Sequence, residues 1–192
     1  MKIGLFFGTF NPIHMGHIIL ANHIQQFGAV DEVWFVVTPR SPFKQNVKLT
    51  DDYERLNMVN LALDDYPNLK SSHIEFHMPQ PNYTVHTLAQ LRENYPQHEF
   101  SLMMGEDNLS GLHKWKNAEF LVQSYDILVY PRIIKNPKTP KVDLSRIFRV
   151  DAPIIEISST FIRQLIKDNK IYRPYLPPSV FDYIDGSSLY KI

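Results

Sequence analysis

The chain has no cysteine among its 192 residues, which excludes disulfide bonds and thiolate metal sites and is typical of a reducing compartment. It has no excess of either charge, since Lys plus Arg and Asp plus Glu both number 20. Nothing global therefore draws it to nucleic acid or to an anionic membrane. No segment approaches the length of a membrane span, and the N-terminal apolar run is too short for a signal peptide. We expect a cytoplasmic protein without nucleic-acid or membrane partners.

The composition that remains is that of a globular domain. Hydrophobic residues make up 44% of the chain and charged residues 21%, close to the average for such proteins. A chain of this length fills one domain with a large core. We therefore predict a single domain over residues 1–192, with a C-terminal helical part at about 158–192.

Two kinds of apolar pattern alternate along the chain. Apolar, partly β-branched runs predict strands at 2–7, 32–38, 74–78, 100–104, 126–130 and near 154–157. Apolar residues at helical spacing predict helices at 13–27, 51–63, 84–95, 117–124, 157–169 and 177–184, whereas 132–145 is expected to be an exposed loop. The alternation predicts an α/β fold with a doubly wound, mainly parallel sheet of five to six strands and helices on both faces. Ligands of such sheets bind beyond the carboxyl ends of the strands.

The stretch GTFNPIHMGH, residues 8–17, follows the first predicted strand and therefore lies at this ligand edge. An ordinary turn into a helix is the simplest interpretation. A zinc site would need more ligands than these two histidines. Their spacing also differs from the i, i+4 zinc motif with its glutamate, because His14 and His17 are spaced i, i+3 with no glutamate beside them. A phosphate site has a mechanism: Gly8 permits close approach to the backbone, Pro12 stiffens the loop, and the first helical turn offers free N–H groups. The two histidines project from the same side of that turn.

A second candidate site begins at Ser158-Ser159-Thr160 and includes Arg163. Hydroxyl residues at a helix start are common as plain N-caps. Arg163, however, follows within about one turn, where its guanidinium can meet a phosphate held by the helix N-terminus. Two helix starts, one near each end of the chain, are therefore expected to clamp one polyphosphate.

Together these stretches resemble the nucleotidylyltransferase superfamily. Its marks are a GxFxPxHxGH-like stretch after the first strand, matched by residues 8–17, and an ISSTxIR-like stretch near the C-terminus, matched by residues 157–163. The resemblance implies a Rossmann-like fold, catalytic roles for His14, His17 and Arg163, and Mg²⁺ carried on the ATP phosphates rather than by protein ligands. It also implies ATP contacts from Gly8, Thr9, Phe10, Gly16, Gly105, Asp107, Ile157, Ser158 and Ser159.

The middle of the chain is similar to the bacterial nicotinate-nucleotide adenylyltransferases, through residues 39–44 (PRSPFK), 82–88 (NYTVHTL), 105–107 (GED) and 115–121 (WKNAEFL). These enzymes make deamido-NAD and pyrophosphate from ATP and nicotinate mononucleotide. The resemblance implies mononucleotide contacts from Lys44, Tyr83, Thr84, Trp115 and Arg132. Each of these residues also has a simpler structural interpretation, as a core aromatic, a helix start or a solvated charge.

This chain also departs from the family pattern. Many members read GGTFDP, where it has Phe7 and Asn11, and many read PPHK, where it has SPFK. Phe43 removes an imidazole, so Lys44 becomes the stronger candidate for the mononucleotide phosphate. Asn82 replaces a usual serine, a milder change.

Two other functions compete with this one. A pantetheine-phosphate adenylyltransferase would share both end motifs, but members of that type tend to be shorter and lack the Trp115 region. A non-catalytic nucleotide sensor would not need His14, His17 and Arg163 together. The implied partners are ATP and nicotinate mononucleotide; a homo-oligomer is compatible with the sequence, which does not set the number of subunits.

Overall fold

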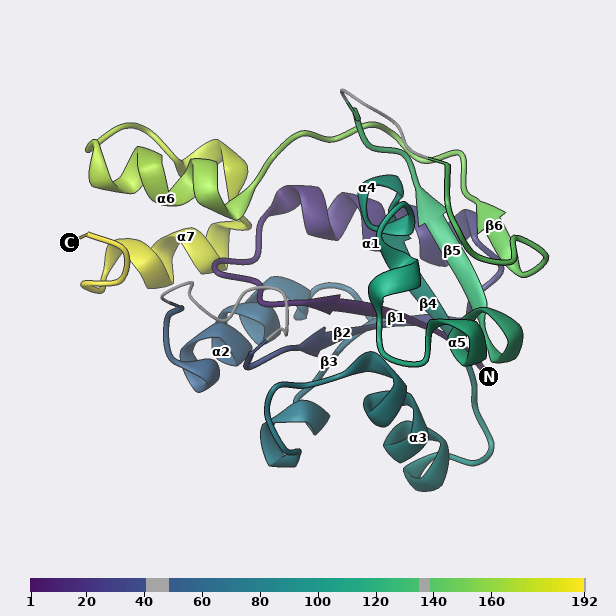
Figure 1. Ribbon diagram of the computed structural model, residues 1–192. Coiled ribbons are helices and arrows are strands. Elements are labelled where there is room, and N and C mark those ends of the chain that lie inside the picture. Colours follow the sequence, from purple (N-terminus) through teal and green to yellow (C-terminus); the bar gives the residue numbers. More distant parts are fainter. Residues whose placement is uncertain (41–48, 135–138, 192) are drawn as a thin grey trace.

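The computed structural model describes residues 1–40, 49–134 and 139–191, and within them six strands form one parallel sheet (Figure 1). The strands are β1 (Lys2–Gly8), β2 (Glu32–Val37), β3 (Leu69–Ser72), β4 (Glu99–Gly105), β5 (Asp126–Tyr130) and β6 (Ile147–Arg149). Their order, β3-β2-β1-β4-β5-β6, is the doubly wound order of Rossmann folds. The predicted fold class is confirmed.

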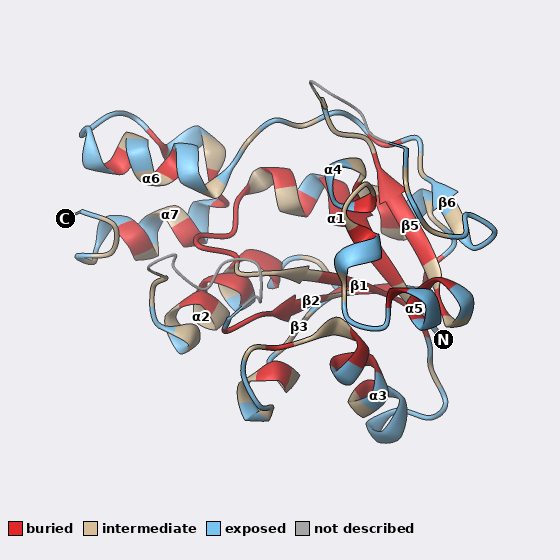
Figure 2. Cartoon of the chain, in the orientation of Figure 1, coloured by how far each residue is buried: buried red, intermediate tan, exposed pale blue. Residues whose placement is uncertain are grey.

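Helices cover both faces of the sheet, as predicted. The α-helices are α1 (Met15–Phe27), α2 (Asp52–Leu63), α3 (Thr84–Asn94), α4 (Glu106–Leu109), α5 (Ala118–Ser124), α6 (Ser159–Lys167) and α7 (Pro178–Asp185); η1 (Ile74–His77), η2 (Leu112–Lys114) and η3 (Arg173–Tyr175) are 3₁₀ turns. One core lies between the sheet and α1, α2, α6 and α7, the other between the sheet and α3 and α5. Successive residues of β1 alternate between them, with Phe6 in the first and Leu5 in the second. The central strands are accordingly buried along most of their length (Figure 2).

Two predicted strands are wrong. Residues 74–77 form η1 instead, and the strand lies earlier, at Leu69–Ser72. Residues 154–157 run outside the sheet, whose last strand is Ile147–Arg149. Both true strands are short edges paired on one side only, so they need no continuous apolar run. The apolar residues near 155 are explained by packing, because Ile155 and Ile157 lie against the core beside α1.

Side-chain caps set the start of two helices that border the site. The Asp51 carboxylate accepts hydrogen bonds from the backbone N–H groups of Tyr53 and Glu54 at the start of α2. The Ser158 hydroxyl accepts one from the N–H of Phe161 at the start of α6. The C-terminal helices then return to α2, where Ser179 donates to the carbonyl of Leu61.

The described part of 132–145 is a loop, as predicted. No helix in the described residues is long and apolar enough to cross a membrane.

Candidate active site

The order of the strands reverses between β1 and β4, and the carboxyl ends of these two strands border the site. In sheets of this kind, ligands bind in the crevice at that point, because the chains leaving adjacent strands diverge to opposite faces. The loop after β1 leads into α1, which packs in one core, and β4 leads into α4, whose Leu109 belongs to the other. The candidate residues of both end motifs and of the GED stretch lie around this edge.

The two histidines at the start of α1 form a stacked pair. Their ring centroids are 3.7 Å apart, with 23° between the ring planes. His17 Nδ1 accepts a hydrogen bond of 3.2 Å from the backbone N–H of His14. This bond places the proton of the neutral His17 ring on Nε2, which makes Nε2 a hydrogen-bond donor.

His14 is held in its neutral form. Its residue is only 3% exposed, and Nδ1 has no hydrogen-bond partner among the described residues. Burial, together with the nearby Arg132 guanidinium, lowers the pKa of His14 from 6.5 to about 3. A neutral imidazole with so low a pKa is a weak base and is better suited to donate a hydrogen bond than to take up a proton.

The second motif lies directly against the first, although 147 to 152 residues separate the bonded partners. The Ser159 hydroxyl donates to the carbonyl of Pro12 at 2.8 Å. Arg163 donates to the carbonyl of Asn11 at 2.7 Å and to the Thr160 hydroxyl at 3.2 Å. The starts of α1 and α6 are therefore neighbours, as the hypothesis of a two-helix clamp requires.

Three predicted ATP contacts of the first motif also have structural roles. A Cβ at Gly8 would lie 2.8 Å from the Phe10 ring, so this glycine makes room for an aromatic side chain. The Phe10 ring is 2% exposed and meets His17 edge to face, with centroids 5.1 Å apart. A Cβ at Gly16 would lie 3.1 Å from both His14 and Ile155. Gly8 and Gly16 thus allow close packing around the histidines, and Phe10 supports His17 from the core.

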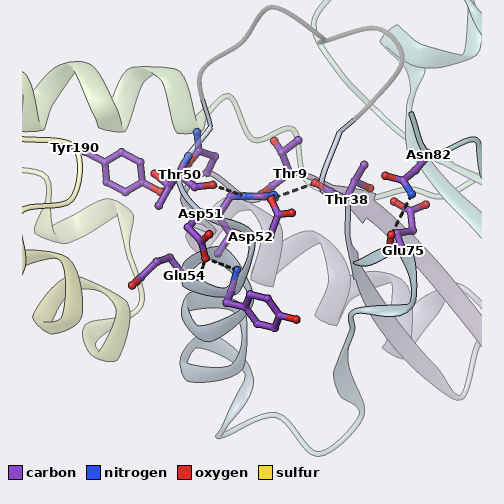
Figure 3. Close-up of polar contacts among 12 residues, drawn as sticks. Thr9, Thr38, Thr50, Asp51, Asp52, Glu54, Glu75, Asn82 and Tyr190 are labelled. Atoms are coloured by element: carbon purple, nitrogen blue, oxygen red, sulfur yellow. Dashed lines mark hydrogen bonds and ion pairs between the residues drawn. The ribbon is translucent and has the colours of Figure 1, made fainter. Parts of the chain in front are cut away.

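Arg55 of α2 is a buried cation that the sequence analysis missed (Figure 3 shows its partners). Its guanidinium donates to the carbonyls of Thr9, Thr38 and Thr50 at 2.6, 2.9 and 3.0 Å and forms an ion pair with Asp52. These bonds connect the chain after β1, the chain after β2 and the start of α2. An arginine inside an amphipathic helix is ordinarily a surface residue, so the sequence carried no signal for this role.

A cavity of about 620 Å³ opens beside the loop that joins β1 to α1, residues 9–14, which we call the histidine loop. Gly8, Thr9, Tyr83, Thr84, Asp107 and Trp115 are among the residues that line it. The structure therefore brings the predicted mononucleotide residues of α3 and of the loop after η2 together with the end of β1. Lys114 and Lys116 also line the cavity, and Lys116 Nζ lies 4.6 Å from the centre of the Tyr83 ring. These lysines suit an anionic ligand, and sequence reasoning had not assigned them.

Two buried polar side chains, Glu75 and Asn82, lie at the wall of this cavity; Figure 3 shows how they face each other. Glu75 is 1% exposed and accepts a hydrogen bond of 2.6 Å from Thr87 of α3. Its pKa is raised by burial, against the opposing effect of hydrogen bonds from Thr87 and Thr38. Asn82 donates to the backbone carbonyl of Glu75 at 3.1 Å. Both residues hold the segment that enters α3, and so position Tyr83 and Thr84.

Arg132, predicted as a mononucleotide contact, is not among the residues that line this cavity, although it packs on Tyr130, which does line it. Its guanidinium donates to the carbonyl of Ile155 at 2.9 Å, lies over the ring of Tyr130 and is close enough to His14 to lower its pKa. Its charge therefore belongs to the histidine side of the site. Lys44 falls outside the described residues. Among the residues that are described, no group of three or more His, Cys, Asp or Glu side chains could hold a metal ion.

Comparison with known proteins defines the class. A family model described as cytidylyltransferase-like matches residues 5–165, and the chain belongs to this family of nucleotidyltransferases. Over its full length it is 56% identical to a probable nicotinate-nucleotide adenylyltransferase of Flavobacterium psychrophilum, all of which is covered. It is 45% identical over 187 residues to one of Bacteroides fragilis, covering 95% of this chain and 90% of the relative. Within the family, the chain therefore belongs to the nicotinate-nucleotide adenylyltransferases.

Solved structures agree on the fold. The nicotinic acid mononucleotide adenylyltransferase of Plasmodium falciparum, complexed with NaAD, superposes with a TM-score of 0.80 at 21% identity, covering 98% of this chain and 97% of that one. The same enzyme complexed with APC gives a TM-score of 0.78.

Proposed function

We infer that this enzyme transfers the adenylyl group of ATP to nicotinate mononucleotide, giving deamido-NAD and pyrophosphate. The observation that carries this inference is the position of the cavity. The cavity holds Tyr83, Thr84 and Trp115, and its wall continues through Gly8 and Thr9 to the loop of the stacked histidines. A site for a pyridine mononucleotide thus adjoins a site for a polyphosphate, which in-line transfer between them requires.

The reaction needs charge compensation more than proton transfer. The attacking group is the phosphate of nicotinate mononucleotide, whose second pKa of about 6 leaves it largely ionised near neutral pH. It attacks the α-phosphorus of ATP, the bond to the β-phosphate oxygen breaks, and pyrophosphate leaves with that electron pair. Two anions must be brought together, so positioned donors contribute most. The low pKa of His14 matches a donor rather than a general base.

We assign the phosphates of ATP to the junction of the two helix starts. His14 and His17 donate to oxygens of the α- and β-phosphates, and Arg163 with the N–H groups near Ser158 and Ser159 holds the outer phosphates. Arg132, whose charge helps to lower the pKa of His14, adds a positive charge on this side. Mg²⁺ enters as part of the MgATP substrate, where it neutralises phosphate charge.

We assign the pyridine ring to the cavity. Trp115 offers a flat surface for stacking, and the N–H groups at the start of α3, near Tyr83 and Thr84, favour the carboxylate of the acid over an amide. Lys114 and Lys116 add positive charge at the cavity wall. We place the reaction in the cytoplasm, where ATP is available. The chain has no cysteine, so a reducing compartment removes no disulfide that would stabilise it.

The direct test is pyrophosphate release from MgATP with one of three acceptors: nicotinate mononucleotide, its amide, or pantetheine phosphate. We expect release with the first and much less with the other two. Preference for pantetheine phosphate would refute the assignment of the cavity, and release with none of the three would refute the reaction itself.

His17→Ala tests the phosphate assignment. Because one positioned donor is lost at the reacting phosphates, kcat should fall on the order of a hundredfold or more while the fold remains. His23→Ala, on the same helix, is the matched control: the His23 ring contacts the carbonyl of Asp151, outside the site, and turnover should stay close to that of the wild type. Near-normal kcat in His17→Ala would contradict the role given to this imidazole.

A further inference from the structure

Asn11, at one of the two departures from the family pattern in the first motif, is a hydrogen-bonding centre of the histidine loop. It is 2% exposed, and its Oδ1 accepts hydrogen bonds from the backbone N–H of Thr50 at 3.3 Å and from the Tyr190 hydroxyl at 2.8 Å. Its backbone carbonyl accepts the bond from Arg163. Asn11 therefore links Thr50 before α2, Arg163 of helix α6 and Tyr190 near the C-terminus.

Tyr190 reaches this centre from the other end of the chain, 179 residues away (Figure 3). Its backbone has a φ of 64°, in the left-handed region that is uncommon for a bulky side chain, so the surrounding contacts hold it there. Burial raises the pKa of Tyr190 to about 12, and the phenol remains a hydrogen-bond donor throughout the physiological range. The packing of this segment on the first core supports the same placement.

Hydrogen bonds from other elements hold the histidine loop on several sides. Its carbonyls at Thr9, Asn11 and Pro12 are held by Arg55, Arg163 and Ser159, which come from α2 and α6. Tyr190 supplies a side-chain bond to the same loop, on the residue three positions before His14. The direction in which the histidines point depends on this loop, because α1 begins immediately after it.

We propose that Tyr190 is a positioning residue for the proposed adenylyl transfer: its hydroxyl, through Asn11 Oδ1, fixes the loop that aims His14 and His17 at the phosphates of ATP. The proposal rests on the proposed function for its kinetic consequence but not for its structural one. Small displacements of catalytic groups reduce rates strongly, since productive geometry is narrow. Tyr190 touches neither substrate in this scheme and acts through Asn11.

Tyr190→Phe removes the hydroxyl and leaves the ring. We expect kcat to fall about three- to tenfold, the effect of one lost hydrogen bond, with the KM for nicotinate mononucleotide unchanged within about twofold. Tyr172→Phe is the matched control: the Tyr172 hydroxyl donates to Asp185 at 3.0 Å, away from the histidine loop, so its loss should leave kcat unchanged. Equal kcat in Tyr190→Phe and the wild type would overturn the proposal.

Asn11 variants separate positioning from general stability. Asn11→Asp keeps an oxygen acceptor for Tyr190 and should retain more turnover than Asn11→Ala, which keeps none. In the Asn11→Ala background, Tyr190→Phe should have no further effect on kcat, because the two residues act as one unit. Additive losses in the double variant would show that Tyr190 does not act through Asn11.

A readout without substrate distinguishes this proposal from the function on which it rests. The ¹⁵N signals of the His17 ring report its bond to the His14 N–H, and they should shift in Tyr190→Phe but not in Tyr172→Phe. Unchanged His17 signals in Tyr190→Phe would overturn the positioning role whatever the enzyme transfers. A wild-type enzyme that releases no pyrophosphate, with signals that shift as expected, would instead refute only the proposed reaction.

Discussion

Arg55→Met is the substitution for which the structure predicts the largest loss of stability. The variant keeps an unbranched apolar side chain of similar length but removes every donor of the guanidinium. The carbonyls of Thr9 and Thr38 then lose partners in a region where the Arg55 side chain is 0% exposed. Each unpaired buried carbonyl costs about 1–3 kcal/mol.

The ion pair adds less to this sum. Asp52 is 36% exposed, so water can solvate its carboxylate once Arg55 is gone. The total loss in the free energy of unfolding is therefore about 3–5 kcal/mol, within the range for breaking a buried pair. At 2–4 °C per kcal/mol for a chain of this size, Tm should fall by about 6–20 °C. Turnover should fall as well, because Thr9 leads into the histidine loop.

Urea unfolding followed by circular dichroism measures the loss, provided that the slope m is unchanged between variants. The control is Arg146→Met, which breaks an ion pair with Asp126 whose side chains are 44% and 40% exposed; it should change stability by less than about 1 kcal/mol. A loss below about 1 kcal/mol in Arg55→Met would refute the reasoning, since it would mean that the carbonyls of Thr9 and Thr38 find other partners.

Two further predictions concern the site. The folded pKa of His14 is about 3, below the unfolded value of 6.5, so its stabilising effect is complete above pH 6.5 and is lost as pH falls toward 3. Without nucleotide, the free energy of unfolding should drop by about 1.4 kcal/mol per pH unit in that window, and His14→Gln should flatten the slope; equal slopes would contradict it. Trp115→Ala should raise the KM for nicotinate mononucleotide; an unchanged KM would refute stacking on this ring.

Sequence patterns predicted the elements that bury both faces. β1, β2, β4 and β5 are dense in apolar residues because helices cover them on both sides, and the predicted ranges agree within two residues. β3 and β6 escaped prediction because an edge strand is specified by pairing with its neighbour, and its own side chains need not be apolar. The strand predicted at residues 74–78 was wrong because its apolar residues Ile74 and Phe76 pack on the two cores from a 3₁₀ turn rather than from a strand.

The residues of the candidate site likewise divide into those that the sequence predicted and those that only the structure revealed. By itself, the sequence determined which residue types approach the phosphates, because histidines and an arginine at two helix starts carry their chemistry in a local pattern. It also determined the fold class, through the alternation of strand and helix periods. Only the tertiary structure decided how the two motifs face each other, that Gly8 makes room for Phe10, and that the charge of Arg132 acts on His14. Arg55, Glu75 and Tyr190 became part of the site for the same reason: their partners lie far along the chain, and a hydrogen bond between distant residues leaves no periodic trace in either segment.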